Sequence, residues 1–430
     1  MNRKRKMPEL LSPAGNFEKM KAALLYGADA VYLAGTRFGM RSAADNFTDG
    51  ELAEAVRYVH ERGKKLYLTL NTMPHTNEYP ALREFLGRIK DFGIDAMIVA
   101  DLGVLATVKE ILPEMEIHIS TQASIVSPEA ARAYAALGAK RLVLARELTL
   151  DEIRAIRGGI PEDVELEAFI HGSMCVSYSG RCMLSQNLTG RDANRGACTQ
   201  PCRWVYTVTE EKRPEMPFPV EQNELGTFVM SSKDMCTIGI VPQLIEAGID
   251  SFKIEGRMKS AYYTAVVTNA YRMAIDAYAA DPDGYTYNPE WYRELESVSH
   301  REYCTGYYLD LPIENAQLSG LNGYIREKAY FATALAEDEI PLPNGLEQQT
   351  ADGKLIPFIQ RNKVSLGDYA ELISPNRIGR GFAVTELYSE SGEEITSAPH
   401  PSMKFWARVP FDVSEGDIMR SGERPEEMEK

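Results

Sequence analysis

Four of the six cysteines in this 430-residue chain lie within 28 consecutive positions, in the frame C-x6-C-x15-C-x3-C. They are Cys175, Cys182, Cys198 and Cys202, and they follow a strand-like run at residues 164–171. Thiolates gathered in this way can ligate zinc, copper(I) or an iron–sulfur cluster, because soft sulfur donors select these centres. The alternative is a set of unpaired buried cysteines, which behave as small apolar residues. We favour ligation, because composition alone rarely clusters cysteines so tightly.

The spacing favours an iron–sulfur cluster over zinc. A structural zinc site usually has two C-x2–4-C turns, and only Cys198 and Cys202 form such a pair. Wider and uneven spacing suits a larger inorganic core that is held from several directions. Glycines can supply the bends between the ligands because they adopt positive φ without a Cβ clash, and the segment contains Gly172, Gly180, Gly190 and Gly196. Cys236 is an alternative fourth ligand, whereas Cys304 is remote and is expected to be structural.

The composition is that of a globular protein of two or three domains, with 44% hydrophobic and 25% charged residues. No run of about 18 apolar residues occurs, so we expect no membrane span. The basic start at residues 1–6 is not followed by the apolar core of a signal peptide. We therefore expect a cytoplasmic protein, in which clustered cysteines bind metals rather than form disulfides.

The net charge of −15 argues against a protein coated in nucleic acid, but one segment differs. Residues 181–213 contain six basic side chains and three acidic ones. An anion-binding surface and an ordinary solvated loop explain this excess equally well.

The first two thirds of the chain repeat one unit, in which a glycine ends a helix, a short turn follows, and an apolar strand comes next. The predicted strands are residues 9–12, 30–34, 66–71, 96–101, 116–121, 141–145, 164–171 and 251–255. Eight such βα units predict an α/β fold, a (β/α)8 TIM-like barrel over residues 1–325. An open doubly wound sheet is the alternative, and the lack of G-x-G-x-x-G after the first strand weighs against it.

Active sites of such barrels lie at the carboxyl ends of the strands. The cysteine segment follows strand seven, so residues 172–228 are predicted to form an enlarged loop over the barrel mouth. Polar residues at the other strand ends point to the same place, namely Asn71, Asp101, Thr121, Gln122, Arg146, Glu147, His171, Lys253, Glu255 and Arg257. Among these, His171, Lys253 and Glu255 are our catalytic candidates.

Arginines are the candidates for substrate binding, because a guanidinium pairs in a bidentate manner with a carboxylate or a phosphate. The candidate arginines are Arg181, Arg191, Arg195 and Arg257. Tyr178 and Trp204 are aromatic residues of the cysteine segment that can stack on a planar ring, with packing in the core as the alternative.

From about residue 326 the pattern changes to short β-rich runs separated by turn residues. These runs are residues 329–336, 355–360, 369–373, 381–387 and 404–408. They predict a small all-β domain, a barrel or sandwich, at residues 326–420. The polar residues 421–430 are expected to form a disordered tail.

One stretch resembles a known signature. The residues from Glu167 to Ser185 fit E-x-F-x-x-G-S-h-C-x4-G-x-C-x-L-S, which is the signature of the peptidase U32, or collagenase-like protease, family. Residues 10–15, 30–35, 253–259 and 299–306 extend the resemblance over nearly the whole chain, including its β-rich end. Within the family, residues 191–196 and 198–204 are most similar to the branch that hydroxylates tRNA.

The resemblance implies an enzyme that forms 5-hydroxyuridine at the wobble position of tRNA without oxygen. It implies an iron–sulfur cluster, expected to be 4Fe–4S, and prephenate as a carboxylate co-substrate. The implied cluster ligands are Cys175, Cys182, Cys198 and Cys202, with Cys236 as the alternative fourth. The implied macromolecular partner is tRNA, and a paralogous U32 subunit is a further candidate partner.

The family name also implies proteolysis, which the residues support poorly. The sequence contains no H-E-x-x-H and no G-x-S-x-G, so a dyad of Cys175 and His171 is the conceivable arrangement. A nucleophile needs one activated thiolate, whereas this segment supplies four. Three functions therefore remain: an RNA-modifying iron–sulfur enzyme, a U32 peptidase, and a non-catalytic RNA-binding or assembly factor.

Overall fold

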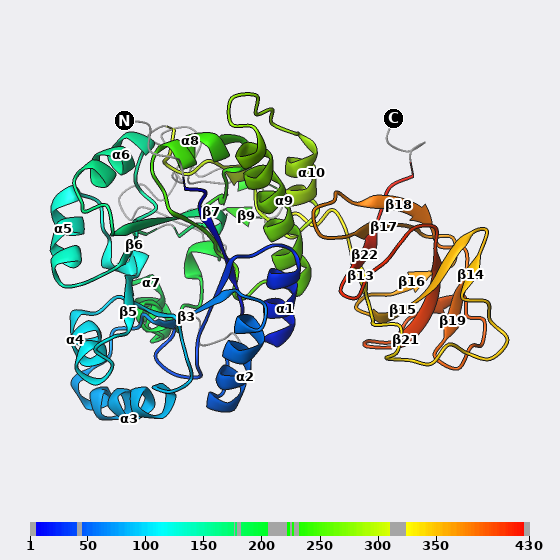
Figure 1. Cartoon of the computed structure of the whole chain (residues 1–430), viewed down its shortest axis with the longest axis horizontal. Coiled ribbons are helices and arrows are strands. Elements are labelled where there is room, and N and C mark those ends of the chain that lie inside the picture. Colours follow the sequence, from blue (N-terminus) through cyan, green and yellow to red (C-terminus); the bar gives the residue numbers. More distant parts are fainter. Residues whose placement is uncertain are drawn as a thin grey trace, which may run out of the picture.

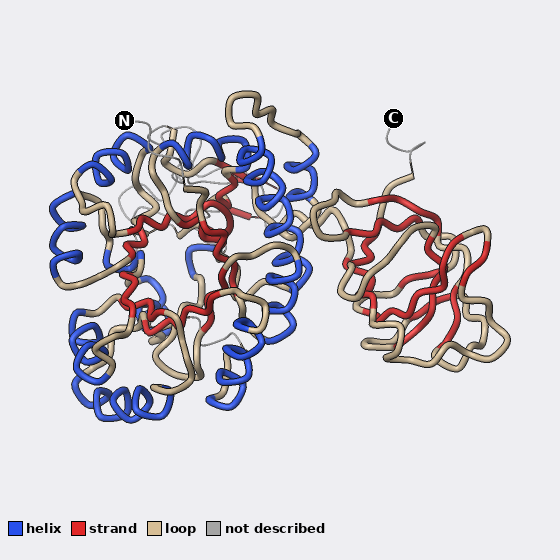
Figure 2. Tube along the Cα trace, viewed as in Figure 1, coloured by secondary structure: helices blue, strands red, loops and turns tan. Residues whose placement is uncertain are grey.

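The computed structural model describes residues 6–40, 45–175, 177–178, 182–204, 222–223, 226–227, 232–309 and 324–424. The chain forms two units (Figure 1). The N-terminal part of the chain forms a ring of strands surrounded by helices, and the C-terminal part forms a compact β unit beside it. Figure 2 shows the ring of strands end-on.

The ring is a closed barrel of eight parallel strands, in the order β11-β1-β2-β3-β4-β5-β6-β7, with β11 also paired to β7. The strands are β1 (Glu9–Pro13), β2 (Ala30–Leu33), β3 (Lys65–Leu70), β4 (Ala96–Val99), β5 (Glu116–Ile119), β6 (Arg141–Val143), β7 (Glu165–Ser173) and β11 (Ser251–Ile254). Each of the eight predicted strands is present. The closing pair confirms the barrel and excludes the open sheet.

Helices surround the barrel, and six of them begin at a side-chain cap. They are α1 (Phe17–Leu25), α2 (Asp49–His60), α3 (Tyr79–Ile89), α4 (Leu102–Ile111), α5 (Pro128–Ala136), α6 (Leu150–Gly158), α8 (Val241–Glu246) and α9 (Ala261–Ala280). Side chains of Asn16, Thr48, Asp101, Ser127, Thr149 and Ser260 accept hydrogen bonds from the first-turn amides. In the described part of the chain, no helix combines the length and apolarity needed to cross a membrane.

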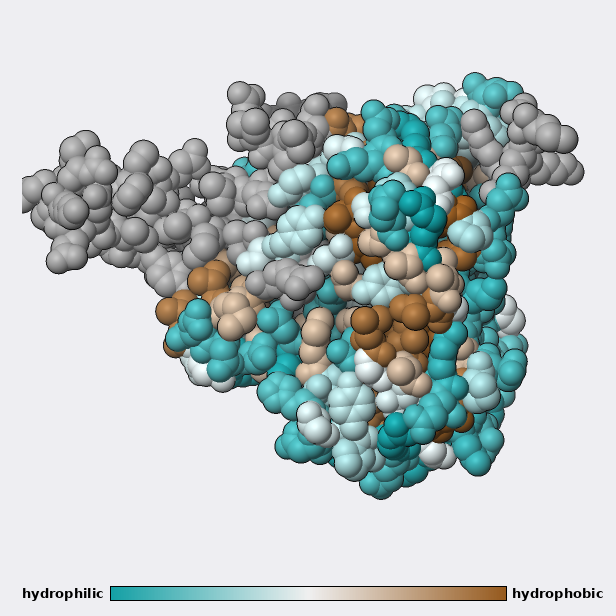
Figure 3. Space-filling view, turned by 90° about the vertical axis from the view of Figure 1, so that its left-hand side faces the viewer, coloured by the Kyte–Doolittle hydropathy of each residue, from teal (hydrophilic) through white to brown (hydrophobic). Residues whose placement is uncertain are grey.

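Each predicted glycine turn has the expected backbone. Gly27, for example, has a φ of 104° before β2, and Gly248 has a φ of 86° before β11. The helices bury one apolar side against the strands, as Leu52, Val56 and Val59 of α2 do. Figure 3 shows that the outer surface over α3–α6 is mainly hydrophilic, with a limited hydrophobic area.

The chain between β7 and β11 carries the cysteine segment. Its described elements are α7 (Leu184–Thr189), the short turns η3 (Ala193–Arg195) and η4 (Pro201–Arg203), the hairpin β8 (Gln222–Asn223) and β9 (Gly226–Thr227), and β10 (Asp234–Cys236). Strand β10 runs antiparallel to the end of β7 and pairs with β12 (Tyr303–Cys304), which follows α10 (Glu290–Glu296). The segment is therefore an addition outside the eight-stranded ring.

The C-terminal β unit has its own hydrophobic core and a main sheet in the order β18-β17-β22-β13-β15-β21-β19. Its strands are β13 (Tyr330–Ala334), β14 (Gln349–Thr350), β15 (Gly353–Gln360), β16 (Val364–Ser365), β17 (Tyr369–Ile373), β18 (Arg380–Ala383), β19 (Leu387–Ser389), β20 (Ser397–Ala398), β21 (Lys404–Val409) and β22 (Ile418–Ser421). The all-β prediction is confirmed.

Two details of this unit differ from the sequence-based expectation. The run 381–387 is two strands, because β18 pairs with β17 whereas β19 pairs with β21. A change of partner strand leaves no local pattern in the sequence. The expected disordered tail was placed at 421–430, but its first residues belong to the β unit. Gly422 donates a hydrogen bond to the carbonyl of Tyr369, and Arg424 donates one to the carbonyl of Gly367. Residues 425–430 lie outside the described residues.

The β unit is fixed to the barrel by polar contacts with α9 and α10. Arg420 of β22 is 1% exposed and donates to Glu294 of α10 (2.8 Å) and to Glu371 of β17 (2.7 Å). The same guanidinium donates to the Ser297 hydroxyl at 2.7 Å. The Asn269 side chain of α9 donates to two backbone carbonyls of the β unit.

Candidate active site

A cavity of about 490 Å³ lies at the carboxyl ends of the barrel strands, beneath the cysteine segment. All four clustered cysteines line it, together with residues from most of the strand ends. The polar residues that line it include Asn71, Ser120, Thr121, Gln122, Arg146, Arg191, Asn194, Lys253, Glu255, Arg257, Lys259 and Arg326. The barrel mouth therefore brings together the cysteines and most of the predicted strand-end residues.

The cysteines are held by local turns rather than by disulfides. All are free thiols, and Cys198 is exposed while the other three are half-buried. The backbone N–H of Gln200 donates to the Cys198 sulfur at 3.3 Å, and Gln200 has a φ of 57°. The Asn194 side chain donates to the Cys182 carbonyl at 3.0 Å. Positive φ occurs at the predicted bends that lie within the described residues, Gly172, Gly190 and Gly196.

The four cysteines are suitable donors for an iron–sulfur cluster, because cysteine thiolates are the ligands that hold such clusters, and all four line this one cavity. Among the described residues, no three side chains of His, Cys, Asp or Glu are placed to hold a single metal ion.

The wall of the cavity is strongly basic. Among the described residues that line it, six are basic and Glu255 is the only acidic one. Lys253, Glu255 and Arg257 come from the end of β11, as predicted. Lys259 and Arg326 were not predicted as site residues. Lys259 lies in the run 253–259 that resembles the U32 family, so the sequence offered a signal for it. Arg326 lies in the connection between the two units, where the sequence offered none.

His171 lies on the other side of its strand, away from the cavity. Phe169 pairs with Lys253, but Ile254 pairs with His171, so Ile170 is an extra residue in β7. A one-residue bulge turns the following side chain to the opposite face. His171 is therefore 1% exposed, with its ring centroid 5.6 Å from that of Tyr271. Burial lowers the pKa of His171 to about 3. This placement does not suit the predicted catalytic role.

Other predicted residues also lie away from the cavity or have structural partners. Arg195 forms a 2.7 Å ion pair with Glu78, which links the cysteine segment to the loop after β3. Asp101 caps α4 and accepts a hydrogen bond from Tyr79. Glu147 is not among the lining residues. Arg181 lies outside the described residues.

Cys236 does not line the cavity either. It is 6% exposed on β10, and burial raises the pKa of its thiol to about 12. The partner of Cys236 in the sheet is His171, on the outward-facing side of the bulge. Cys202, in contrast, lines the cavity with the other three cysteines. The geometry therefore favours Cys202 over Cys236 as the fourth ligand.

Both aromatic candidates are exposed. Tyr178 is 46% exposed and lines the cavity, and Trp204 is 42% exposed. The alternative of core packing is therefore wrong for these two residues, and their rings lie at the surface of the cysteine segment.

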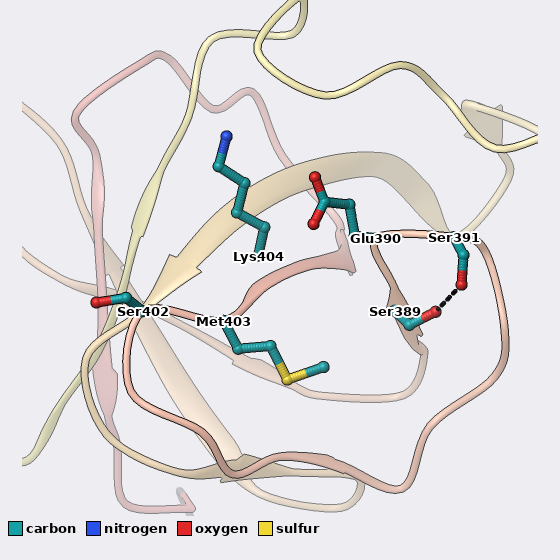
Figure 4. Close-up of a pocket in the computed structure, with 6 residues that line it drawn as sticks. All are labelled: Ser389, Glu390, Ser391, Ser402, Met403 and Lys404. Carbon is teal, nitrogen blue, oxygen red and sulfur yellow. Dashed lines mark hydrogen bonds between the residues drawn. The ribbon is translucent and has the colours of Figure 1, made fainter.

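A second hollow lies in the β unit (Figure 4). Its lining consists of Ser389, Glu390, Ser391, Ser402, Met403 and Lys404. The hydroxyls of Ser389 and Ser391 are hydrogen-bonded at 2.9 Å, and the other side chains point in different directions. No convergent set of polar groups forms there, so the barrel cavity is the better candidate site.

Two family models match the chain. Residues 15–317 match Peptidase family U32, and residues 345–420 match the Peptidase family U32 C-terminal domain. The chain belongs to the peptidase U32 family. Its signature residues, Glu167 to Ser185, include most of β7 and the first two cysteines of the cavity.

Three curated U32 relatives illustrate the range of names in the family. The chain is 37% identical over 417 residues to tRNA hydroxylation protein P1 of Bacillus subtilis, covering 97% of this chain and 95% of that protein. It is 33% identical over 445 residues to tRNA hydroxylation protein P of Escherichia coli, covering 94% of each. It is 34% identical over 336 residues to a collagenase of Porphyromonas gingivalis, covering 75% of this chain and 78% of that one.

Proposed function

We propose that this U32 protein hydroxylates tRNA, forming 5-hydroxyuridine at the wobble position in the cytoplasm. We further propose that it uses an iron–sulfur cluster on Cys175, Cys182, Cys198 and Cys202, and prephenate in place of oxygen. Two relatives named as tRNA hydroxylation proteins support the substrate, because each aligns with more than nine tenths of this chain. The observation that carries the proposal is one basic cavity lined by all four clustered cysteines.

The residues of the cavity have separable tasks in this proposal. The cluster, when bound, would supply electron transfer and a Lewis-acidic iron. The basic side chains bind oxyanions of the substrates, and the exposed Tyr178 ring offers a stacking surface for an unpaired base. Glu255 is the one carboxylate among the described lining residues, so it is the group available to accept a proton.

The direct test is mass spectrometry of tRNA nucleosides from a strain that lacks the gene. We expect 5-hydroxyuridine and its derivatives to disappear and to return when the wild-type gene is restored. Unchanged wobble nucleosides in the deletion strain would contradict the proposed function.

The name of the collagenase relative makes peptidase activity the second candidate. The geometry gives it little support, because no histidine is among the described residues that line the cavity. His171, the base of the conceivable dyad, lies behind the strand bulge. Ser173 ends β7 and has its carbonyl hydrogen-bonded to Arg146 at 3.1 Å.

We expect Ser173→Ala to leave tRNA hydroxylation and iron content within about twofold of wild type, because in this proposal the hydroxyl forms no covalent bond to substrate and is not a cluster ligand. A serine peptidase would instead lose essentially all activity, since its nucleophile performs the covalent step. Peptide hydrolysis that survives removal of the cluster but disappears in this variant would restore the peptidase assignment.

For RNA binding, we expect Arg191→Ala to weaken affinity and to lower the slope of log Kd against log salt concentration by about 1, because one phosphate contact is lost. Fluorescence anisotropy with a labelled tRNA measures the slope. Arg62→Ala is the control, since Arg62 follows α2 at the opposite end of the barrel and packs on Tyr58. Equal slopes for Arg191→Ala and wild type would mean that the RNA is held elsewhere.

A further inference from the structure

A buried lysine ammonium at the floor of the cavity uses only some of its hydrogen-bond donors. Lys253 is 4% exposed, and its Nζ donates to Glu167 Oε1 at 2.7 Å. The ammonium also lies 4.4 Å from the ring centroid of Tyr32 and 5.7 Å from that of Phe169. A lysine ammonium has three N–H donors, and among the described residues Glu167 alone accepts one from it. Two donors therefore remain at the cavity wall.

The residues below Lys253 fix it in place. Glu167 is fully buried and also accepts from Arg141 at 3.2 Å and from the Ser251 hydroxyl at 3.3 Å. Arg141 in turn pairs with Glu9 and Glu165, each at 2.6 Å. Strands β1, β6, β7 and β11 each direct one or more of these side chains into the barrel. A continuous charged network thus runs from the cavity floor through the barrel interior to the far end of β7.

Stability alone is a weak reason for such a network. Buried ion pairs lose much of their Coulomb attraction to desolvation, and well-packed apolar residues often replace them without loss of stability. The network does, however, hold an ammonium at one position beneath a cavity. Arg257, which is 3% exposed, lines the same cavity, so a second buried cation can act with it. Both groups are buried, so water screens them little, which strengthens their attraction for an anion.

Resting on the proposed function, we propose that Lys253 is the anchor for a carboxylate of the small co-substrate, and that Glu167 is its positioning residue. The floor of the cavity favours a free organic acid over an RNA phosphate, because an extruded nucleotide keeps its phosphate close to the strand from which it came. The Tyr32 and Phe169 rings beside the ammonium suit an acid with an apolar body. Arg191 and Arg326 come from outside the ring of strands and suit phosphates.

The test uses the full-length, cluster-loaded protein and the variants Lys253→Met, Lys253→Arg and Glu167→Gln. For Lys253→Met we expect the KM for prephenate to rise about 30-fold or more, because the carboxylate of prephenate loses its buried positively charged partner. Glu167→Gln should raise the same KM less, and Lys253→Arg, which keeps the charge, should retain part of the affinity. The KM for tRNA should stay unchanged in all three. Lys140→Met is the control, because Lys140 pairs with Asp163 at the protein surface.

Calorimetric titration with prephenate and with uridine 5′-monophosphate separates the two oxyanions. Loss of binding for the first compound alone supports the carboxylate assignment. Loss for the nucleotide alone would assign Lys253 to a phosphate and overturn it. Lower melting temperatures with unchanged KM values would also overturn the inference, because a purely structural network has that result. Absence of tRNA hydroxylation in the wild-type protein would contradict the proposed function instead.

Discussion

Anaerobically purified Cys182→Ser protein is expected to be colourless, to contain little iron or sulfide, and to leave its tRNA unmodified. The thiolate is one of the four that line the cavity, and serine is a poor ligand for the iron of a cluster. The barrel should remain folded, since the cysteine segment lies outside the eight-stranded ring. Visible absorbance, iron and sulfide analysis, circular dichroism and nucleoside mass spectrometry measure these properties together.

Cys304→Ser and Cys236→Ser are the matched controls, because neither cysteine lines the cavity. Both variants should keep the visible absorbance and the hydroxylation activity. Zinc in the wild-type protein in place of iron would show that the cluster assignment is wrong. Loss of colour in Cys236→Ser with colour retained in Cys202→Ser would show that Cys236, and not Cys202, is the fourth ligand.

Arg420→Met is expected to destabilise the protein by about 3–5 kcal/mol, because it removes the buried cation that pairs with Glu294, whereas Glu371 keeps its ion pair with Lys328. The partners are Glu294 on α10 and Glu371 on β17, so the change affects the junction of barrel and β unit. Urea unfolding followed by circular dichroism measures the loss.

Arg424→Met is the control for this substitution. Arg424 is exposed in the same unit and donates to one backbone carbonyl, so its replacement should change the free energy of unfolding by about 0.5 kcal/mol or less. Equal stability of the two variants would mean that the Arg420 ion pairs do not hold the two units together.

The sequence by itself determined the architecture and the four cysteines that meet at the cavity. Helix caps, glycine turns and short apolar strands are local features, because each depends on neighbours a few residues away. They predicted all eight barrel strands, and the general property of such barrels then located the site at the strand ends. The cysteine frame was equally local, and its four residues do line one cavity.

Only the tertiary structure decided which way several side chains face and which partners they have. His171 faces away from the cavity because a bulge exists only relative to the partner strand, β11. Arg195 pairs with Glu78, 117 residues earlier in the chain, and Lys253 with Glu167, 86 residues earlier. Such contacts arise when the barrel closes and brings distant strands together. No periodicity or spacing within one segment records them.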